Sequence, residues 1–304
     1  MRQLSLTCVC SFLAATAVAE LPEAARDYVL DTNASDEFDG SKLDENRWMP
    51  WNPSFPGRSA GFLFASDNVA VKDGRAVLTA RFLRDDEKTP ENLLRGYDTY
   101  ATGTIKSKAK YLYGYFECRA KTMKANVCNA FWLYDPHSGN LRAKFTAGDV
   151  SEEIDIFEVT SRADFKGEYD CRRIYYNTLH AYKTPYLEGV VSLYKQELEG
   201  YSGQKKVDFD FCDDYHTCGL LWTPTELVWY LDGKVTYRRR NDIFHRPLHV
   251  TFDSEIMYDW FGIPDPKDLP ATFEIDWFRR WRNASPAERA TVDRQPIGGL
   301  GSIH

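Results

Sequence analysis

The middle of the chain carries three carboxylic acids at short spacing, in Glu153-Ile154-Asp155-Ile156-Phe157-Glu158. Side chains two residues apart in a strand share one face, so Glu153 and Asp155 project together, away from the isoleucines. Strict alternation would turn Glu158 toward the core, where an unpaired carboxylate is costly. One extra residue at Ile156-Phe157, a β-bulge, returns Glu158 to the acidic face. We therefore expect three carboxyls along one groove.

Crowded carboxyls have pKa values that are pushed apart, because their charges repel one another. A retaining glycosidase uses such a split: one carboxylate attacks the anomeric carbon, and a protonated carboxyl donates to the leaving oxygen. Glu153 and Glu158 on one face could meet the separation of about 5–5.5 Å that is typical of retaining enzymes. The pattern alone also fits an acidic strand face in solvent, or a calcium site.

Short runs of alternating apolar residues, separated by turn signals, surround this motif. Residues 68–72 and 75–80 flank Asp73-Gly74, and residues 226–231 and 234–238 flank Asp232-Gly233, which predicts two hairpins. Residues 113–121 and 273–281 alternate in the same way, and helical periodicity is scarce. Many short strands predict an all-β fold, either a sandwich or a barrel, in one large domain.

The composition is ordinary for a soluble globular protein that is mildly acidic. The chain has 304 residues, a net charge of −7, 43% hydrophobic residues and 14% aromatic residues. With no long basic run, nucleic acid is a poor candidate partner. The aromatic content suits either a β-rich core or a surface on which sugar rings stack.

The chain begins with a predicted leader. An apolar stretch between Arg2 and Ala19 ends in a small-x-small pattern, so residues 1–19 form a predicted signal peptide cleaved near Ala19-Glu20. The mature chain would be secreted or periplasmic, with no membrane span. Residues 283–304 form a predicted tail. Five cysteines remain after cleavage, among which a Cys212–Cys218 loop bridge is open.

The sequence resembles glycoside hydrolase family 16 along nearly the whole of residues 20–282. The segments that carry the resemblance occur in the family's order: 36–48 (DEFDGSKLDENRW), 102–108 (TGTIKSK), 113–117 (YGYFE), 129–133 (NAFWL), 153–158 (EIDIFE), 221–226 (LWTPTE), 229–233 (WYLDG) and 273–281 (FEIDWFRRW). The resemblance implies a β-jelly-roll sandwich with a concave substrate cleft. It implies Glu153 as the nucleophile, Glu158 as the acid/base, and Asp155 as the residue that controls the nucleophile's proton and orientation. The bulged spacing is typical of laminarinases and algal galactanases rather than of lichenases and xyloglucan enzymes.

Three further segments are similar to the agarase, porphyranase and κ-carrageenase branch: residues 50–58, 177–180, and 248–255 followed by 260–264. Predicted substrate-binding residues follow from these segments and from the strand before the motif: Trp51, Arg58, Trp132, Arg142, His180 and Glu255. Trp132 could stack on a galactose ring or lie in the core. His180 could contact the sugar or Asp155, or be structural, and Glu255 could bind a sugar hydroxyl or be a surface carboxylate.

Basic residues in and near these segments could bind a charged substrate. Arg58 could bind a sulfate or hydroxyl through its forked donors. Arg142 and Lys144 lie in a long polar segment, 135–151, that either forms a wall of the cleft or is a solvated loop. We expect no cofactor in catalysis. The resemblance implies a possible structural calcium site, with Asp276 and backbone near Gly74 as ligands.

We expect a secreted, endo-acting, retaining hydrolase of β-linked red-algal galactan, agar or porphyran, with a lean to a sulfated chain. A κ-carrageenan or furcellaran hydrolase and a laminarinase stay open as alternatives. A carbohydrate-binding protein that has lost catalysis is a different class. It is disfavoured, since Glu153, Asp155 and Glu158 are all present. The polysaccharide is the expected partner, and we expect a monomer.

Overall fold

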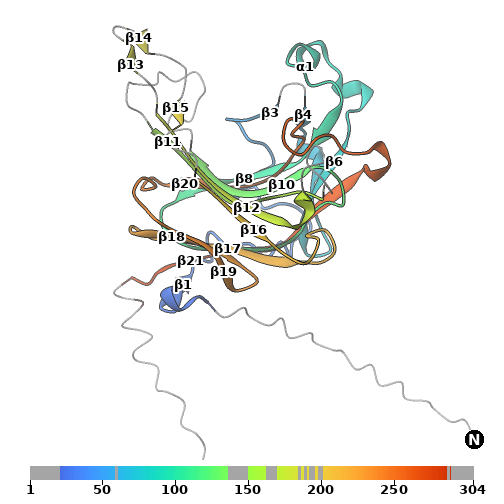
Figure 1. The fold of residues 1–304 in the computed structure, drawn as a ribbon. Helices are drawn as coiled ribbons and strands as arrows, with labels where there is room; N and C mark the ends of the chain where they lie inside the picture. The colour runs from blue at the N-terminus through green and yellow to red at the C-terminus, as the bar shows by residue number, and fades with distance from the viewer. Residues whose placement is uncertain are drawn as a thin grey trace, which may run out of the picture.

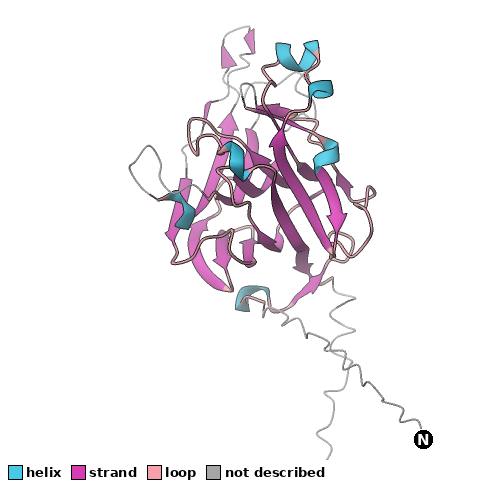
Figure 2. Ribbon diagram, turned by 90° about the vertical axis from the view of Figure 1, so that its right-hand side faces the viewer, coloured by secondary structure: helices cyan, strands magenta, loops and turns pink. Residues whose placement is uncertain are grey.

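The computed structural model describes residues 21–58, 61–135, 150–161, 170–183, 186–187, 190–191, 196–197, 201–285 and 288. Strands dominate these residues (Figure 2), which confirms the all-β prediction. Apart from the single helical residue Glu288, helical structure in the described part consists of α1 (Pro90–Leu94) and of short 3-10 turns at η1 (Glu23–Ala25), η2 (Ser66–Asn68), η3 (Asp85–Glu87), η4 (Cys171–Arg173) and η5 (Pro266–Asp268). None of the described helices is long and apolar enough to span a bilayer.

The larger of the two main sheets, here called the outer sheet, has eleven strands, with β1 added at β21 and β5 added at β6. In spatial order its main path is β19 (Lys234–Arg240), β18 (Glu226–Leu231), β17 (His216–Trp222), β9 (Gly114–Lys121), β21 (Ala271–Asn283), β6 (Arg75–Phe82), β7 (Tyr100–Thr102), β4 (Phe62–Phe64) and β3 (Gly57–Arg58). The two added strands are β1 (Tyr28–Leu30) and β5 (Val69–Lys72).

The second sheet, here called the inner sheet, has eight strands and curves above the outer sheet (Figure 1). Its path is β15 (Gln196–Glu197), β12 (Ile174–Lys183), β11 (Val150–Val159), β10 (Cys128–Asp135), β20 (Leu248–Glu255), β8 (Thr104–Tyr111) and β2 (Trp48–Met49), and β16 (Tyr201–Lys206) pairs with β12. A separate pair, β13 (Tyr186–Leu187) and β14 (Val190–Val191), rises at one end, and α1 rises at the other. The two packed sheets form the predicted sandwich.

The main hydrophobic core lies between the sheets and is rich in aromatic rings. Phe131, from the inner sheet, stacks on Phe252 with ring centroids 4.5 Å apart and meets Phe278 of the outer sheet at 5.9 Å. Complete burial of a large apolar side chain contributes roughly 1.5–3 kcal/mol, so this core fixes the inner sheet firmly. One face of each inner strand is thereby committed to the core, and the other face is left for chemistry.

Both predicted hairpins are present. Asp73 and Gly74, between β5 and β6, have φ of 52° and 71°, and Asp232 and Gly233, between β18 and β19, have 48° and 73°. Two successive positive φ angles match the twist of a tight antiparallel hairpin, which is why Asp-Gly favours this turn.

The cysteines in the described residues, Cys118, Cys128, Cys171, Cys212 and Cys218, are buried and form no disulfide with one another. The Cys212–Cys218 bridge that the sequence left open is therefore not formed in this structure. The predicted leader (1–19) and nearly all of the predicted tail (283–304) lie outside the described residues. The division into leader, catalytic domain and tail stays a prediction.

Candidate active site

Strand β11 contains the predicted β-bulge. Asp155 pairs with Trp132 of β10, but the next pair is Phe157 with Phe131, so Ile156 has no partner on that strand. The pairing with β12 shifts between Asp155 and Glu158. Ile154, Ile156 and Phe157 belong to the main core. The prediction that a bulge restores Glu158 to the acidic face is confirmed.

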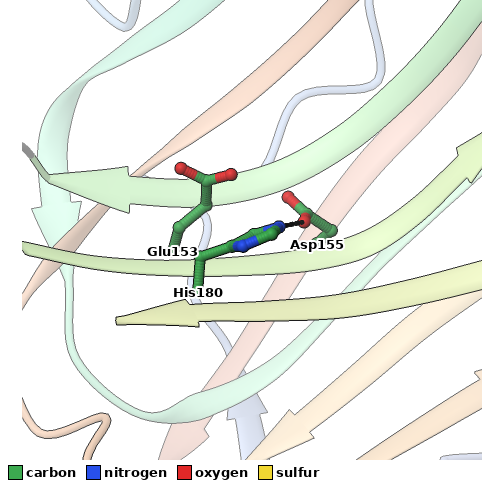
Figure 3. A group of neighbouring side chains, drawn as sticks. All are labelled: Glu153, Asp155 and His180. Atoms are coloured by element: carbon green, nitrogen blue, oxygen red, sulfur yellow. Dashed lines mark ion pairs between the residues drawn. The ribbon is translucent and has the colours of Figure 1, made fainter. Parts of the chain in front are cut away.

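Strand pairing gives each of the three acids defined neighbours on the concave face, meaning the face of the inner sheet that points away from the core. The pairs are Glu153 with Tyr134 and His180, Asp155 with Trp132 and Thr178, and Glu158 with Ala130 and Tyr176. Because cross-strand partners face the same way, these side chains line one surface. Figure 3 shows Glu153, Asp155 and His180 on this surface.

Asp155 is the most enclosed of the three acids and is 4% exposed. Its Oδ2 lies 3.5 Å from His180 Nε2, and its backbone carbonyl accepts a hydrogen bond of 3.0 Å from the Trp229 indole beneath the sheet. Burial, followed by the charges of Glu158 and Glu153, raises the pKa of Asp155 well above its usual value. Asp155 can therefore hold a proton between the two glutamates.

Glu158 has the electrostatics of a proton donor. Burial, followed by the charges of Glu255 and Glu153, raises the pKa of Glu158 to about 8, while Arg58 and a weak 3.5 Å hydrogen bond from Thr178 oppose the rise. At neutral pH the carboxyl therefore keeps its proton. A protonated carboxyl above a sugar site is what general-acid catalysis needs.

Two more acids, Asp253 and Glu255, lie on the neighbouring part of the concave face, on β20. Together with the three acids of β11 they form what we call the acidic row. Asp253 Oδ2 accepts a hydrogen bond of 3.0 Å from the Trp132 indole, and Glu255 Oε2 accepts two hydrogen bonds from Arg58, of 2.6 and 3.2 Å. Burial raises the pKa of both acids. Sequence reasoning singled out Glu255 and missed Asp253. The signal was available, because residues two apart on a strand share a face.

These contacts define where three predicted binding residues lie. Trp132 is 7% exposed and packs with Tyr134 in a small cluster on the concave side, not in the main core. Glu255 is buried and paired, so it is not a plain surface carboxylate. Arg58 holds Glu255 but keeps 45% of its side chain exposed. Their roles toward a sugar stay predictions.

A lysine that the sequence analysis did not single out fastens the segment before β3 to the sheet. Lys106 is buried, and its Nζ lies 3.2 Å from Asn52 Oδ1 and 3.5 Å from Ser54 Oγ. Burial lowers the pKa of its ammonium to about 8. Trp51, next to Asn52, is 47% exposed. An exposed indole on a fastened segment can serve as a platform for a sugar ring.

Arg142 and Lys144 lie outside the described residues. Asp276 and Gly74 are both described, and Asp276 Oδ2 accepts a 2.6 Å hydrogen bond from Arg119. That guanidinium already neutralises the one predicted carboxylate ligand. The calcium site stays a prediction, and no step of the chemistry rests on it.

One cluster in the described chain brings potential metal ligands together: atoms of Glu153, Asp155 and His180 lie within 4.8 Å of one another. Two carboxylates and an imidazole do not supply the six or more oxygen ligands that calcium takes. This cluster therefore does not suit calcium.

Comparison with known proteins agrees with this geometry. A family model described as "Beta-porphyranase A-D, GH16 domain" matches residues 28–283. This chain belongs to glycoside hydrolase family 16. Within family 16 it lies in the branch that contains agarases, porphyranases and carrageenases. The predicted family and the predicted jelly-roll sandwich are both confirmed.

Relatives within family 16 span most of the chain. β-Porphyranase B from Zobellia galactanivorans is 26% identical and covers 84% of this chain and 85% of its own length. κ-Carrageenase from Pseudoalteromonas carrageenovora is 25% identical and covers 86% of this chain and 68% of its own length. The crystal structure of the β-porphyranase BpGH16B from Bacteroides plebeius has a TM-score of 0.68 at 24% identity, over 86% of this chain and 95% of that one.

Proposed function

We propose that this family 16 member is a secreted, endo-acting, retaining hydrolase that cleaves β-linked red-algal galactan of the agar or porphyran type. The observation that carries the proposal is the bulge in β11, which places Glu153, Asp155 and Glu158 on one face. Membership in the branch of agarases, porphyranases and carrageenases supports galactan as the substrate class. The predicted leader, residues 1–19, supports secretion.

The first step divides the work between two glutamates. Glu153 attacks the anomeric carbon and forms a glycosyl–enzyme ester, while protonated Glu158 gives its proton to the glycosidic oxygen of the departing sugar. In the second step Glu158, now a carboxylate, takes a proton from water, and that water breaks the ester at the anomeric carbon. Two inversions leave the β configuration retained.

Asp155 and His180 support this cycle from the same face. When Glu153 becomes an ester it loses its negative charge, so the carboxyl of Asp155 is freer to ionise. His180 Nε2, 3.5 Å from Asp155 Oδ2, can stabilise the negative charge that Asp155 then gains. Trp132, fixed by its bond to Asp253, would contact the sugar only along the part of its ring that stays exposed.

The test compares five polysaccharide substrates side by side. Reducing ends are measured with agarose, porphyran, κ-carrageenan, furcellaran and laminarin, and the anomer of the first product is followed by NMR. We expect turnover on agarose or porphyran, with the β anomer appearing first. Activity on laminarin with none on any galactan would make the chain a β-1,3-glucanase. Activity on κ-carrageenan or furcellaran alone would favour the κ-carrageenase alternative. Hydrolysis of none of the five would favour a carbohydrate-binding protein.

A further inference from the structure

A pocket of about 710 Å³ lies beside the acidic row and is not used by the proposed chemistry. Its volume is in the range of pockets that hold small ligands. Its wall includes Arg58, Asp98, Thr99, Tyr258, Asp259 and Trp260. They come from β3, from the segment just before β7, and from the turn that follows β20.

Two contacts join this pocket to the Glu158 end of the acidic row. Arg58, in the pocket wall, bonds to Glu255 at 2.6 Å, and Glu255 is close enough to Glu158 for its charge to raise the pKa of Glu158. Trp260 meets Tyr176 edge-on at 5.1 Å, and Tyr176 is the strand partner of Glu158. The pocket therefore lies where a polysaccharide that runs along the concave face past Glu158 would arrive.

The aromatic part of the wall is held firmly. Trp260 stacks on the buried ring of Phe261 at 4.1 Å. The backbone amides of Trp260, Phe261 and Gly262 all donate hydrogen bonds to the Met257 carbonyl. Tyr258, in the same turn, is 42% exposed. Fixed and partly exposed aromatic rings suit stacking on the apolar face of a sugar.

The charges of the pocket favour hydroxyl groups over sulfate. Among the described residues of the wall the cation is Arg58, and Glu255 already neutralises its charge. Two exposed carboxylates, Asp98 and Asp259, therefore give the pocket wall a negative charge. The Thr99 hydroxyl donates to Asp98 Oδ1 at 2.7 Å, which orients that carboxylate. Carboxylates accept hydrogen bonds from sugar hydroxyls but repel an anionic ester.

We propose that this pocket is an extra subsite for one uncharged sugar unit of the polysaccharide, which stacks on Trp260 and is bound through its hydroxyls by Asp98 and Asp259. The inference rests on the proposed function and narrows it: sulfate esters on the substrate are excluded from the unit that enters here. A sulfated chain can still bind, provided that its sulfates fall at other positions.

Substrate length tests the subsite itself. We expect kcat/KM on neutral oligosaccharides of increasing length to rise at the length that first fills the pocket. Trp260→Leu should remove about tenfold of that rise. An unchanged length profile in a folded Trp260→Leu variant would overturn the proposal.

Charge reversal tests the selectivity and does not depend on the packing of Trp260. The double variant Asp98→Lys, Asp259→Lys should raise the ratio of kcat/KM for sulfated over neutral long oligosaccharides by at least about tenfold. The control Asp86→Lys, at an exposed residue of η3 outside this wall, should leave that ratio unchanged. An equal ratio in the double variant and the wild type would overturn the proposal.

Binding to the inactive Glu153→Gln protein separates this inference from the proposed function. Calorimetry with neutral oligosaccharides from agarose and laminarin, and with sulfated ones from porphyran, needs no turnover. If the wild type cleaves laminarin and no galactan, the proposed substrate is wrong, yet Trp260→Leu should still weaken binding of long laminari-oligosaccharides. If the wild type cleaves galactan and neither pocket variant alters binding, the pocket inference alone fails.

Discussion

Glu153 and Glu158 lie on the same face of β11, but their surroundings differ. Glu153 is flanked by Tyr134 and His180. Glu158 lies near Asp253 and Glu255 and has a pKa of about 8. Environment, rather than residue type, is what separates a nucleophile from a proton donor. This difference supports the proposed roles, in which Glu153 attacks and Glu158 donates the proton.

Replacement of Glu153 by glutamine should abolish hydrolysis. The amide keeps the shape of the side chain but cannot form the glycosyl ester, so we expect kcat to fall by more than about 10³-fold. The melting temperature and oligosaccharide binding should be retained. Glu91→Gln, at an exposed position in α1, serves as the matched control. Turnover above a few per cent of wild type would rule out Glu153 as the nucleophile.

The pH profile should report Glu158. Its raised pKa means that the proton-donating form is present below about pH 8, so kcat/KM should fall as the pH rises through that value. The charge of Glu255 contributes to the rise, so Glu255→Gln should move the alkaline limb to lower pH. Profiles are measured on a soluble oligosaccharide, with Glu226→Gln as a distant control. A shift to higher pH would mean that another group controls the limb.

At the level of strands, the bulge could be predicted because one local conflict required it. Acids at the first, third and sixth positions of a six-residue run cannot all face outward in a regular strand. The core does not accept a lone carboxylate, so the strand must bulge. The spacing from Glu255 gives the face of Asp253, but the contacts of Asp253 and Lys106 could not be predicted in the same way. Their roles depend on strands paired across the sheet: Trp132 and Asp253 are 121 positions apart in the sequence. Only the closed fold brings such residues together.

Two single-residue deletions in β11 should have opposite effects on catalysis. Deletion of Ile156 removes the residue that has no partner on β10, so Glu153, Asp155 and Glu158 stay on one face and measurable activity should remain. Deletion of Ile154, an equally buried isoleucine, puts Glu153 and Asp155 on opposite faces and should abolish activity. Either deletion removes a buried side chain and should cost about 2–5 kcal/mol of stability.

Reducing-end assays on the folded fraction of each deletion variant, at a temperature where circular dichroism shows both folded, give the comparison. An equal loss of activity in the two variants would show that the bulge does not act by setting the face on which the acids lie.

Across the whole molecule, stability comes from the packed sheets rather than from covalent cross-links. The five cysteines of the described residues are buried as thiols. Burial raises the thiol pKa of four of them, Cys118, Cys128, Cys212 and Cys218. Buried, protonated thiols are poor nucleophiles. The predicted secretion does not change this, because a disulfide needs two sulfurs in a suitable geometry.

Thiol titration should therefore give two different counts. In the native protein a thiol reagent should find almost no reactive group, and after denaturation without reductant it should find five in the chain from Glu20 onward. The melting temperature should be the same with and without dithiothreitol. Three titratable thiols in the denatured protein would reveal a disulfide and contradict the structure.

The position of β21 has a consequence for how the chain is made. This strand, near the end of the sequence, lies between β9 and β6 in the outer sheet and also pairs with β1. Its Phe273 packs against Phe157 of the bulge, so the catalytic strand lacks part of its support until β21 has joined. A ribosome releases β1, β6 and β9 long before Asn283, and until then two strands beside the gap have unpaired edges. The outer sheet therefore closes, and β11 gains its full support from beneath, only after the chain has been synthesised as far as Asn283.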